Sequence, residues 1–242
     1  MTAAARRWVV LLAALGVAVL TARLGVWQLD RAAQKSALQA ALESKRALPP
    51  LAQAELARDA ATAAAQQHRA VTLQGQWLAA LTVYLDNRQM NGRPGFYALT
   101  PLRLDDGSAV LVQRGWLPRD AADRTRIAAA PPPAGRVQVQ GRIALAPPRL
   151  YQFDAAASGP IRQNLDLDAY ARETALPLRP LTVVQEDGQP PVGDGLQRQW
   201  PRPAADVHKH YGYAFQWFAL SALTLGLYVW FQLIRPRRVR PA

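Results

Sequence analysis

The sequence predicts a membrane-anchored α+β protein, in which N- and C-terminal transmembrane helices flank an antiparallel β-barrel or sandwich-like domain. Long apolar runs lie near both ends of the 242-residue chain, and arginine residues flank them. Between the runs, the apolar residues alternate with a period of two and turn signals recur at short intervals. The expected segments are a cytoplasmic N-terminus (1–7), a first transmembrane helix (8–27), a helical stem (28–48), a periplasmic β-rich domain (49–207), a second transmembrane helix (211–234) and a basic cytoplasmic tail (235–242).

The first apolar run extends from Trp8 to Ala22, and residues 24–27 lengthen it if the Arg23 side chain reaches toward the lipid headgroups. A cleaved signal peptide also has a basic start and an apolar centre, so this alternative stays open. Arg23 and large neighbours occupy the positions where a cleavage site needs small residues, which favours a retained anchor. The helical pattern then continues outward until Pro49-Pro50, which is expected to end it.

The second run, 211–234, contains no charged residue, and a helix of that length is about 36 Å long, enough to cross a bilayer. Arginine beside membrane spans favours the cytoplasmic side, so both termini are expected inside and the central domain outside. The arginines concerned are Arg6, Arg7, Arg235, Arg237, Arg238 and Arg240. They account for half of the formal charge of +12, and the middle region has no basic stripe with interleaved aromatics, so no nucleic-acid partner is expected.

The middle region begins with an alanine-rich segment, 52–67, that predicts a short exposed helix. Alternating residues predict strands over 70–77, 82–87, 96–104, 109–116, 136–145 and 180–187. Asp105-Asp106-Gly107 predicts a hairpin between two of them. Segment 159–175 predicts a helix with Asp166 or Asp168 near its start, and 185–207 reads as a polar, proline-rich return to the membrane.

Composition argues against several kinds of site. The chain has no cysteine, which excludes covalent haem attachment and thiolate metal sites, and only Met1 and Met90 carry thioethers. His68 is the single histidine of the middle region and is interpreted as a polar residue at a strand end rather than a general base. Ser108 and Ser158 lie outside any nucleophile-elbow pattern, so an enzyme is not expected.

The stretches NRQMNGRPGFYALTPL and VLVQRGWLP interrupt strands with glycine and arginine. Gly115 inside a strand pattern indicates a bulge or a close backbone approach. One interpretation is a partner-recognition surface formed by Arg88, Arg114 and Trp116. The alternative is structural arginines with a core tryptophan, and the sequence leaves both open.

The stretch HKHYGYAFQWF holds the best candidate site. On a helix that starts near residue 206, His210, Tyr213, Ala214 and Trp217 share a face, while His208 points away. A neutral imidazole at the membrane boundary can ligate a haem iron. The alternative is the aromatic belt common at bilayer interfaces.

Four separated stretches resemble the surfeit locus protein 1 family of cytochrome oxidase assembly factors. They are GVWQLDRAAQK (25–35), NGRPGFYALTPL (91–102), VLVQRGWLP (110–118) and HYGYAFQWF (210–218). Their order and spacing and the two flanking spans match the family over nearly the whole chain. Gln113 stands where asparagine is common, and Tyr211 stands where an aliphatic residue usually follows the histidine.

The resemblance implies a non-enzymatic factor in the bacterial inner membrane that receives haem a from haem A synthase and aids its insertion into oxidase subunit I. It singles out His210 as the residue that matches the family histidine. We expect the haem between the helix through Trp27 and Arg31 and the helix that begins at His210, with Tyr213 and Trp217 beside it. Arg31 and Lys35, which share a helical face with Trp27, are expected to pair with the propionates.

Two further points accompany this expectation. Ala222 and Gly226 offer a small-residue face for close packing of the spans. A scaffold that stabilises nascent subunit I without touching haem is the alternative function, and a membrane-tethered enzyme is a third class that the sparse catalytic inventory disfavours.

Overall fold

The computed structural model describes residues 2–120, 122–123, 126–127, 131–151, 159–188, 193–201 and 207–235. The chain divides into two compact units, which we call the helical unit (Met1–Ala41 with Arg202–Ala242) and the β unit (Leu42–Pro201). Ser158, Arg237, Arg238 and Arg240, which the sequence interpretation used, lie outside the described residues.

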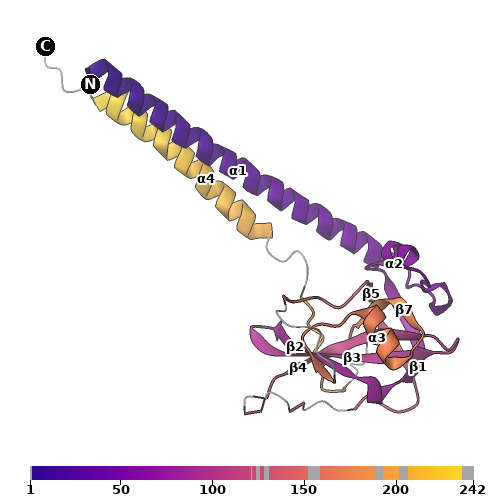
Figure 1. Ribbon diagram of the computed structural model, residues 1–242. Coiled ribbons are helices and arrows are strands. Elements are labelled where there is room, and N and C mark those ends of the chain that lie inside the picture. Colours follow the sequence, from indigo (N-terminus) through magenta and orange to yellow (C-terminus); the bar gives the residue numbers. More distant parts are fainter. Residues whose placement is uncertain are drawn as a thin grey trace. The chain divides into compact units, whose positions relative to one another are not determined.

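Two long helices form the helical unit. Helix α1 (Ala3–Ala47) is uninterrupted and ends just before Pro49-Pro50, as the sequence predicts, because proline cannot donate a helical hydrogen bond. Helix α4 (Val207–Tyr228) continues as a π-helical segment (Val229–Ile234). In the described part of the chain, these are the two helices long and apolar enough to cross a membrane. They run antiparallel and side by side, so the start of α1 and the end of α4 lie together (Figure 1).

In the β unit, the described residues contain seven strands in one sheet of order β1-β5-β7-β4-β3-β2-β6, and a further pairing of β1 with β3 closes it into a barrel (Figure 1). The strands are β1 (Ala70–Trp77), β2 (Val83–Met90), β3 (Arg93–Leu104), β4 (Ala109–Pro118), β5 (Arg136–Ala144), β6 (Ile161–Arg162) and β7 (Leu178–Gln185). Strand β3 pairs with two strands in succession: its first half pairs with β2, and its last residues pair with β1. The barrel alternative, rather than the sandwich, is therefore the observed architecture.

Two strand pairs depart from the expected antiparallel arrangement. Strand β4 pairs with β7 in parallel, and β2 pairs with β6 in parallel. A parallel pair needs a long crossover, and the connection from β4 to β7 contains β5, β6 and helix α3 (Leu167–Thr174). The sequence shows each strand separately but not the direction of its distant partner.

Barrel closure depends on one glycine. Gly75 lies opposite Leu104 of β3 and opposite Val137 of β5, so β1 is paired on both edges at this residue. A Cβ at this position would lie 2.2 Å from the backbone oxygen of Arg103, so any larger residue would force the strands apart. The predicted hairpin over 105–107 is confirmed, with Gly107 in the left-handed region at a φ of 80°.

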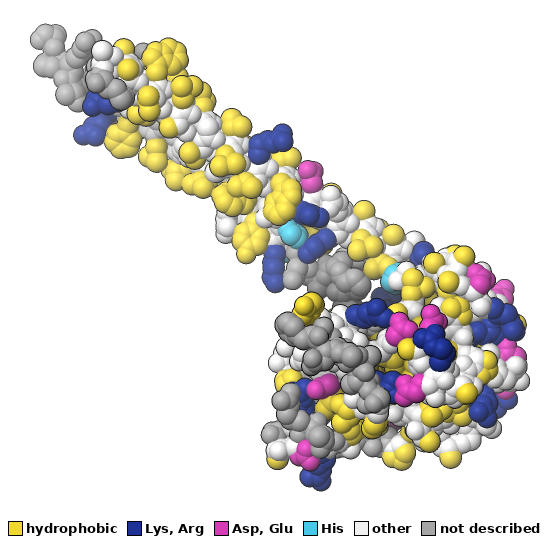
Figure 2. Space-filling view, in the orientation of Figure 1, with side chains coloured by type: hydrophobic (Ala, Val, Ile, Leu, Met, Phe, Trp, Pro, Cys, Tyr) yellow, Lys and Arg dark blue, Asp and Glu magenta, His cyan; other side chains and the backbone are white. Residues whose placement is uncertain are grey.

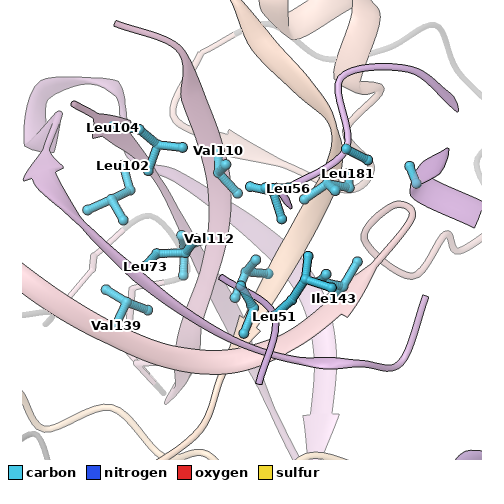
Figure 3. Close-up of a cluster of buried hydrophobic side chains, with 14 residues drawn as sticks. Leu51, Leu56, Leu73, Leu102, Leu104, Val110, Val112, Val139, Ile143 and Leu181 are labelled. Carbon is cyan, nitrogen blue, oxygen red and sulfur yellow. The ribbon is translucent and has the colours of Figure 1, made fainter. Parts of the chain in front are cut away.

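The barrel interior is a cluster of aliphatic side chains, which Figure 3 shows. It includes Leu73, Leu102, Val112, Ile143 and Leu181, each from a different strand. Burying such side chains contributes roughly 1.5–3 kcal/mol each.

Segment 52–67 is not the exposed helix that the sequence predicts. It forms a short 3-10 helix (Gln53–Glu55) and helix α2 (Ala60–Gln66), and its Leu56, Ala57 and Ala63 belong to the barrel core. The buried Arg179 fixes the segment, donating to the Leu56 carbonyl at 3.0 Å and pairing with Asp106 at 2.6 Å. Hydrogen bonds from Ser108 and the nearby Arg179 lower the pKa of Asp106, which keeps this carboxylate charged.

The segment after β5 also differs from the prediction in part. Residues Ile161–Arg162 form β6 instead of helix, and α3 begins only at Leu167. Asp166 rather than Asp168 is its N-cap, accepting from the backbone N–H of Ala169 at 3.0 Å. Helix α3 then covers the β2–β3 region through the fully buried Tyr170, whose hydroxyl donates to the Leu81 carbonyl.

Candidate functional site

The two helices of the helical unit meet along a seam with alternating spacings of three and four residues. On α1 the less exposed positions that follow this spacing are Leu11, Ala14, Ala18, Thr21, Gly25, Gln28, Ala32 and Lys35. On α4 they are Val207, His210, Ala214, Trp217, Ser221, Thr224 and Tyr228. This heptad spacing resembles that of a coiled coil, but most of the residues are small or polar.

The outer surface of the helical unit is apolar instead. Large hydrophobic side chains such as Leu12, Leu20 and Phe215 are 64%, 61% and 74% exposed. Figure 2 shows hydrophobic side chains gathered over the visible face of these helices. A helix pair in water would place its apolar residues in the seam, so this inverted distribution suits a lipid environment.

His210 lies in the seam at the first turn of α4. Its Nδ1 lies 2.7 Å from Oε1 of Gln28 on α1. Since an amide oxygen only accepts, Nδ1 donates, and the neutral ring carries its lone pair on Nε2. Nε2 makes no hydrogen bond to any of the described residues. A histidine whose Nδ1 is held by an oxygen acceptor is arranged as metal-ligating histidines usually are.

The other residues that the sequence nominates lie around this pair with different degrees of exposure. On α1, the Arg31 guanidinium lies 5.6 Å from the ring centre of Trp27 and donates to Gln34 at 3.1 Å. Lys35 is half-buried along the seam. On α4, Ala214 is buried, Trp217 is half-buried and Tyr213 is 52% exposed. The predicted separation of the two histidines is confirmed, because His208 is exposed and His210 faces α1.

Beyond the first turn of α4, the seam between the two helices is closely packed. A Cβ at Gly25 would lie 2.8 Å from the ring of Phe218, and the Ser221 hydroxyl donates to the Ala18 carbonyl at 2.9 Å. A haem held by His210 would therefore lie at the first turn of α4 and not deeper in the seam. The residues there fit a single ligating imidazole, because Trp27 and Tyr213 offer exposed aromatic surface and Arg31 offers a cation.

The prediction of a small-residue packing face at Ala222 and Gly226 is wrong. Both residues are exposed, and nothing lies within 4 Å of a Cβ built at Gly226. The close packing uses Ala14, Ala18 and Gly25 of α1 against Ala214 and Ser221 of α4. Both sets have the spacing of a small-residue packing face, and only the contacts with the partner helix show which of the two faces packs.

The proposed recognition surface of Arg88, Arg114 and Trp116 is not at the surface. The three side chains are at most 3% exposed, so the structural alternative describes them. Arg88 donates to the Gln163 carbonyl at 2.7 Å, and its own carbonyl accepts from the Trp116 indole at 2.9 Å. These contacts hold β6 and the β2 edge to β4.

The bulge expected near Gly115 is confirmed. The pairing register of β3 with β4 shifts between Ala98 and Leu99. Ala98 pairs with Gly115 and Leu99 pairs with Gln113, so Arg114 is the extra residue of the bulge. Arg114 then pairs with the buried Asp194 at 3.1 Å, and Asp194 also binds Arg198 at 2.6 Å. Burial is the main cause that lowers the pKa of Arg114, and Asp194 opposes it.

Residues 193–201 are therefore more than a polar return to the membrane. Leu196 packs in a buried cluster, Gln197 pairs with Trp116 through the backbone, and Trp200 lies edge-on to Tyr97 at 5.0 Å. Residues 189–192 and 202–206 of the same predicted segment lie outside the described residues.

His68 lies at a strand end, as expected, two residues before β1. The pKa of its imidazole is lowered, mainly by burial and then by the positive charges of Arg142, Lys45 and Arg46, so the ring is neutral at pH 7. In the part of the chain that the structure describes, no group of three or more His, Asp or Glu side chains is arranged to hold a metal ion.

Sequence reasoning missed Gln28, Asp194 and Arg198. Gln28 carries a detectable signal, because it continues the Ala18, Thr21 and Gly25 spacing of α1 as a polar residue. Asp194 and Arg198 lie in a proline-rich stretch whose composition resembles a solvated loop, so no local pattern marks them as buried.

The chain resembles known proteins over most of its length. The SURF1 family model matches residues 15–222. A SURF1-like protein from Monosiga brevicollis is 29% identical over 236 residues, which cover 90% of this chain and 85% of the relative. A SURF1-like protein from Rickettsia bellii is 24% identical over 212 residues, covering 85% of this chain and 83% of the relative. The cytochrome oxidase assembly protein SHY1 from Saccharomyces cerevisiae is 32% identical over 100 residues, 39% of this chain and 24% of SHY1.

Proposed function

The chain belongs to the SURF1 family, and from this premise we propose that it is a membrane-anchored assembly factor for cytochrome oxidase that holds haem a at His210. The family match and the name of the yeast relative support the assembly role. A non-enzymatic action follows from that role. The single observation that carries the haem proposal is the 2.7 Å contact between His210 and Gln28.

The membrane anchor is supported by the inverted distribution of side chains in the helical unit. Small and polar residues fill the seam, and the large apolar residues face outward. Arg6 and Arg7 of α1 and Arg235 after α4 lie at the same end of the antiparallel pair. We propose the bacterial inner membrane, with that end cytoplasmic and the β unit periplasmic.

The site is at the opposite end of both apolar runs, where Asp30 and Arg31 follow on α1 and Lys209 precedes on α4. Haem a, when bound, would supply an iron that a neutral imidazole can ligate. His210 provides the ligand through Nε2, Trp27, Tyr213 and Trp217 provide aromatic contact, and Arg31 and Lys35 attract the propionates. One ligand from one helix end keeps the binding reversible, as transfer from haem A synthase to oxidase subunit I requires.

The test is the colour of the purified protein. The full chain, expressed with haem A synthase and purified in detergent, is expected to show a haem a absorption band. His210→Ala should lose the band, because it removes the axial ligand, and His208→Ala should keep it, because His208 is exposed and faces away from the seam. A colourless wild-type preparation would refute the carrier model.

The scaffold function remains the second candidate because the seam encloses no space at Gly25 and Phe218. A scaffold would stabilise nascent subunit I through protein contacts alone. The two functions differ in one measurable respect: under the carrier model His210→Ala impairs both haem retention and oxidase assembly, and under the scaffold model it leaves assembly unchanged.

A further inference from the structure

We infer that Gln28 is a positioning residue for His210, and that its side-chain carbonyl fixes the tautomer and ring orientation that iron ligation requires. The inference rests on the proposed haem-carrier function for its purpose. The contact itself can be measured without haem.

The geometry defines which nitrogen carries the proton. Gln28 Oε1 lies 2.7 Å from Nδ1 of His210, a good distance for N–H···O. A neutral histidine in water mixes both tautomers and favours the proton on Nε2. The amide oxygen of Gln28 selects the opposite tautomer, which leaves Nε2 free to bind a metal.

The surroundings of the pair keep it together. Gly25 and Ala32 lie one turn to either side of Gln28, and both are buried. Ala214, one turn after His210, is 2% exposed. These small neighbours leave room for two long polar side chains to meet across the seam. Since both side chains are half-buried, losing the partner would leave a partly buried polar group without its hydrogen bond.

The choice of an amide rather than a carboxylate has a chemical consequence. A carboxylate would attract the Nδ1 proton more strongly and make Nε2 a more basic, tighter ligand. The neutral amide orients the ring with less increase in basicity. Gln28 therefore orients the imidazole without the additional basicity that a carboxylate would give it.

The first experiment uses the apo protein. Nitrogen-15 NMR of the full chain in detergent, labelled at its three histidines, reports the tautomer of each ring, and His210→Ala assigns the signal. His210 should carry its proton on Nδ1 at a pH where it is neutral. Gln28→Leu should return it to the ordinary mixture, and Gln216→Leu, the same change at an exposed position of α4, should not. A wild-type His210 with its proton on Nε2 would overturn the inference.

The second experiment uses the haem-loaded protein. Gln28→Leu should weaken haem a binding about 10–100-fold, the usual effect of removing such a partner. Gln28→Glu should retain haem, lower its reduction potential and slow its release, because it restores an acceptor of greater strength. Unchanged affinity, potential and release in both variants would contradict the inference. A wild-type chain that retains no haem a would instead refute the proposed function, while the tautomer measurement still decides the role of Gln28.

Discussion

At the scale of single residues, the β unit is notable for arginines whose charge is buried and paired. Arg114 and Arg198 share the carboxylate of Asp194, which is itself only 7% exposed. Arg114 also lies 5.4 Å from the ring centre of Trp77. Asp194 thus pairs with both guanidinium groups, of which Arg198 also pairs with the half-exposed Asp187 at 2.9 Å, and it links β4 to residues 193–201.

Asp194→Asn should strongly destabilise the β unit. The asparagine can still accept from the backbone N–H of Leu196, but it leaves the charges of Arg114 and Arg198 without their shared partner. Breaking a buried ion pair from one side costs about 3–5 kcal/mol. Denaturant unfolding of the detergent-solubilised chain, followed by tryptophan fluorescence, measures this loss.

Asp105→Asn is the matched control. The Arg136–Asp105 pair is shorter, at 2.6 Å, yet its side chains are 56% and 53% exposed. Water screens such a pair, so the change should cost less than about 1 kcal/mol. Equal losses of unfolding free energy in Asp194→Asn and Asp105→Asn would show that burial does not determine how much these ion pairs contribute to stability.

At the scale of elements, the packing of α1 on α4 determines where the site lies. The seam places Gln28 against His210 and Ala18 against Ser221 in one antiparallel register. A shift of either helix by one turn would separate Gln28 from His210. The contact between these two candidate-site residues therefore depends on the register of the helix pair.

Disulfide cross-linking tests this register, and the chain has no native cysteine to interfere. Ala18→Cys combined with Ser221→Cys should cross-link readily under mild oxidation, because Ser221 contacts the Ala18 backbone at 2.9 Å. Ala18→Cys with Ala222→Cys should cross-link poorly, since Ala222 is exposed. Mass spectrometry of the purified chain gives the cross-linking yield. A higher yield for the pair at positions 18 and 222 than for the pair at positions 18 and 221 would show that Ala222 faces α1.

At the scale of the whole molecule, the proposed topology places both termini in the cytoplasm and the β unit outside. Alkaline phosphatase fused after residue 188 should be active, because that part of the β unit is exported. A fluorescent protein fused to the C-terminus should fold and fluoresce in the cytoplasm. An epitope tag at the N-terminus should remain on the mature chain, whereas its loss would indicate a cleaved signal peptide.

Much of the fold and part of the site follow from local sequence pattern. Residues 70–77 alternate as a strand, Asp105-Asp106-Gly107 predicts a turn, and helical spacing alone separates His210 from His208. The four motif stretches correctly indicated the family. These features are local because they depend on residues within one or two turns or on one strand.

Other features were wrong or invisible for a common physical reason. Arg88 and Arg114 have the composition of a surface, and only their distant partners show that they are buried. Leu56 lies in an alanine-rich stretch without a clear apolar face, yet it enters the barrel core. The residues that pair with a buried charge or pack over a strand lie far away in the sequence, so no local pattern identifies them.

The sequence by itself determined the two apolar helices, the individual strands and the separate faces of His208 and His210, because periodicity and charge act over short distances along the chain. Tertiary structure alone decided the parallel pairs, the closure of the barrel at Gly75 and the seam that brings Gln28 to His210. These contacts join residues far apart in sequence, where packing and burial select one partner among many.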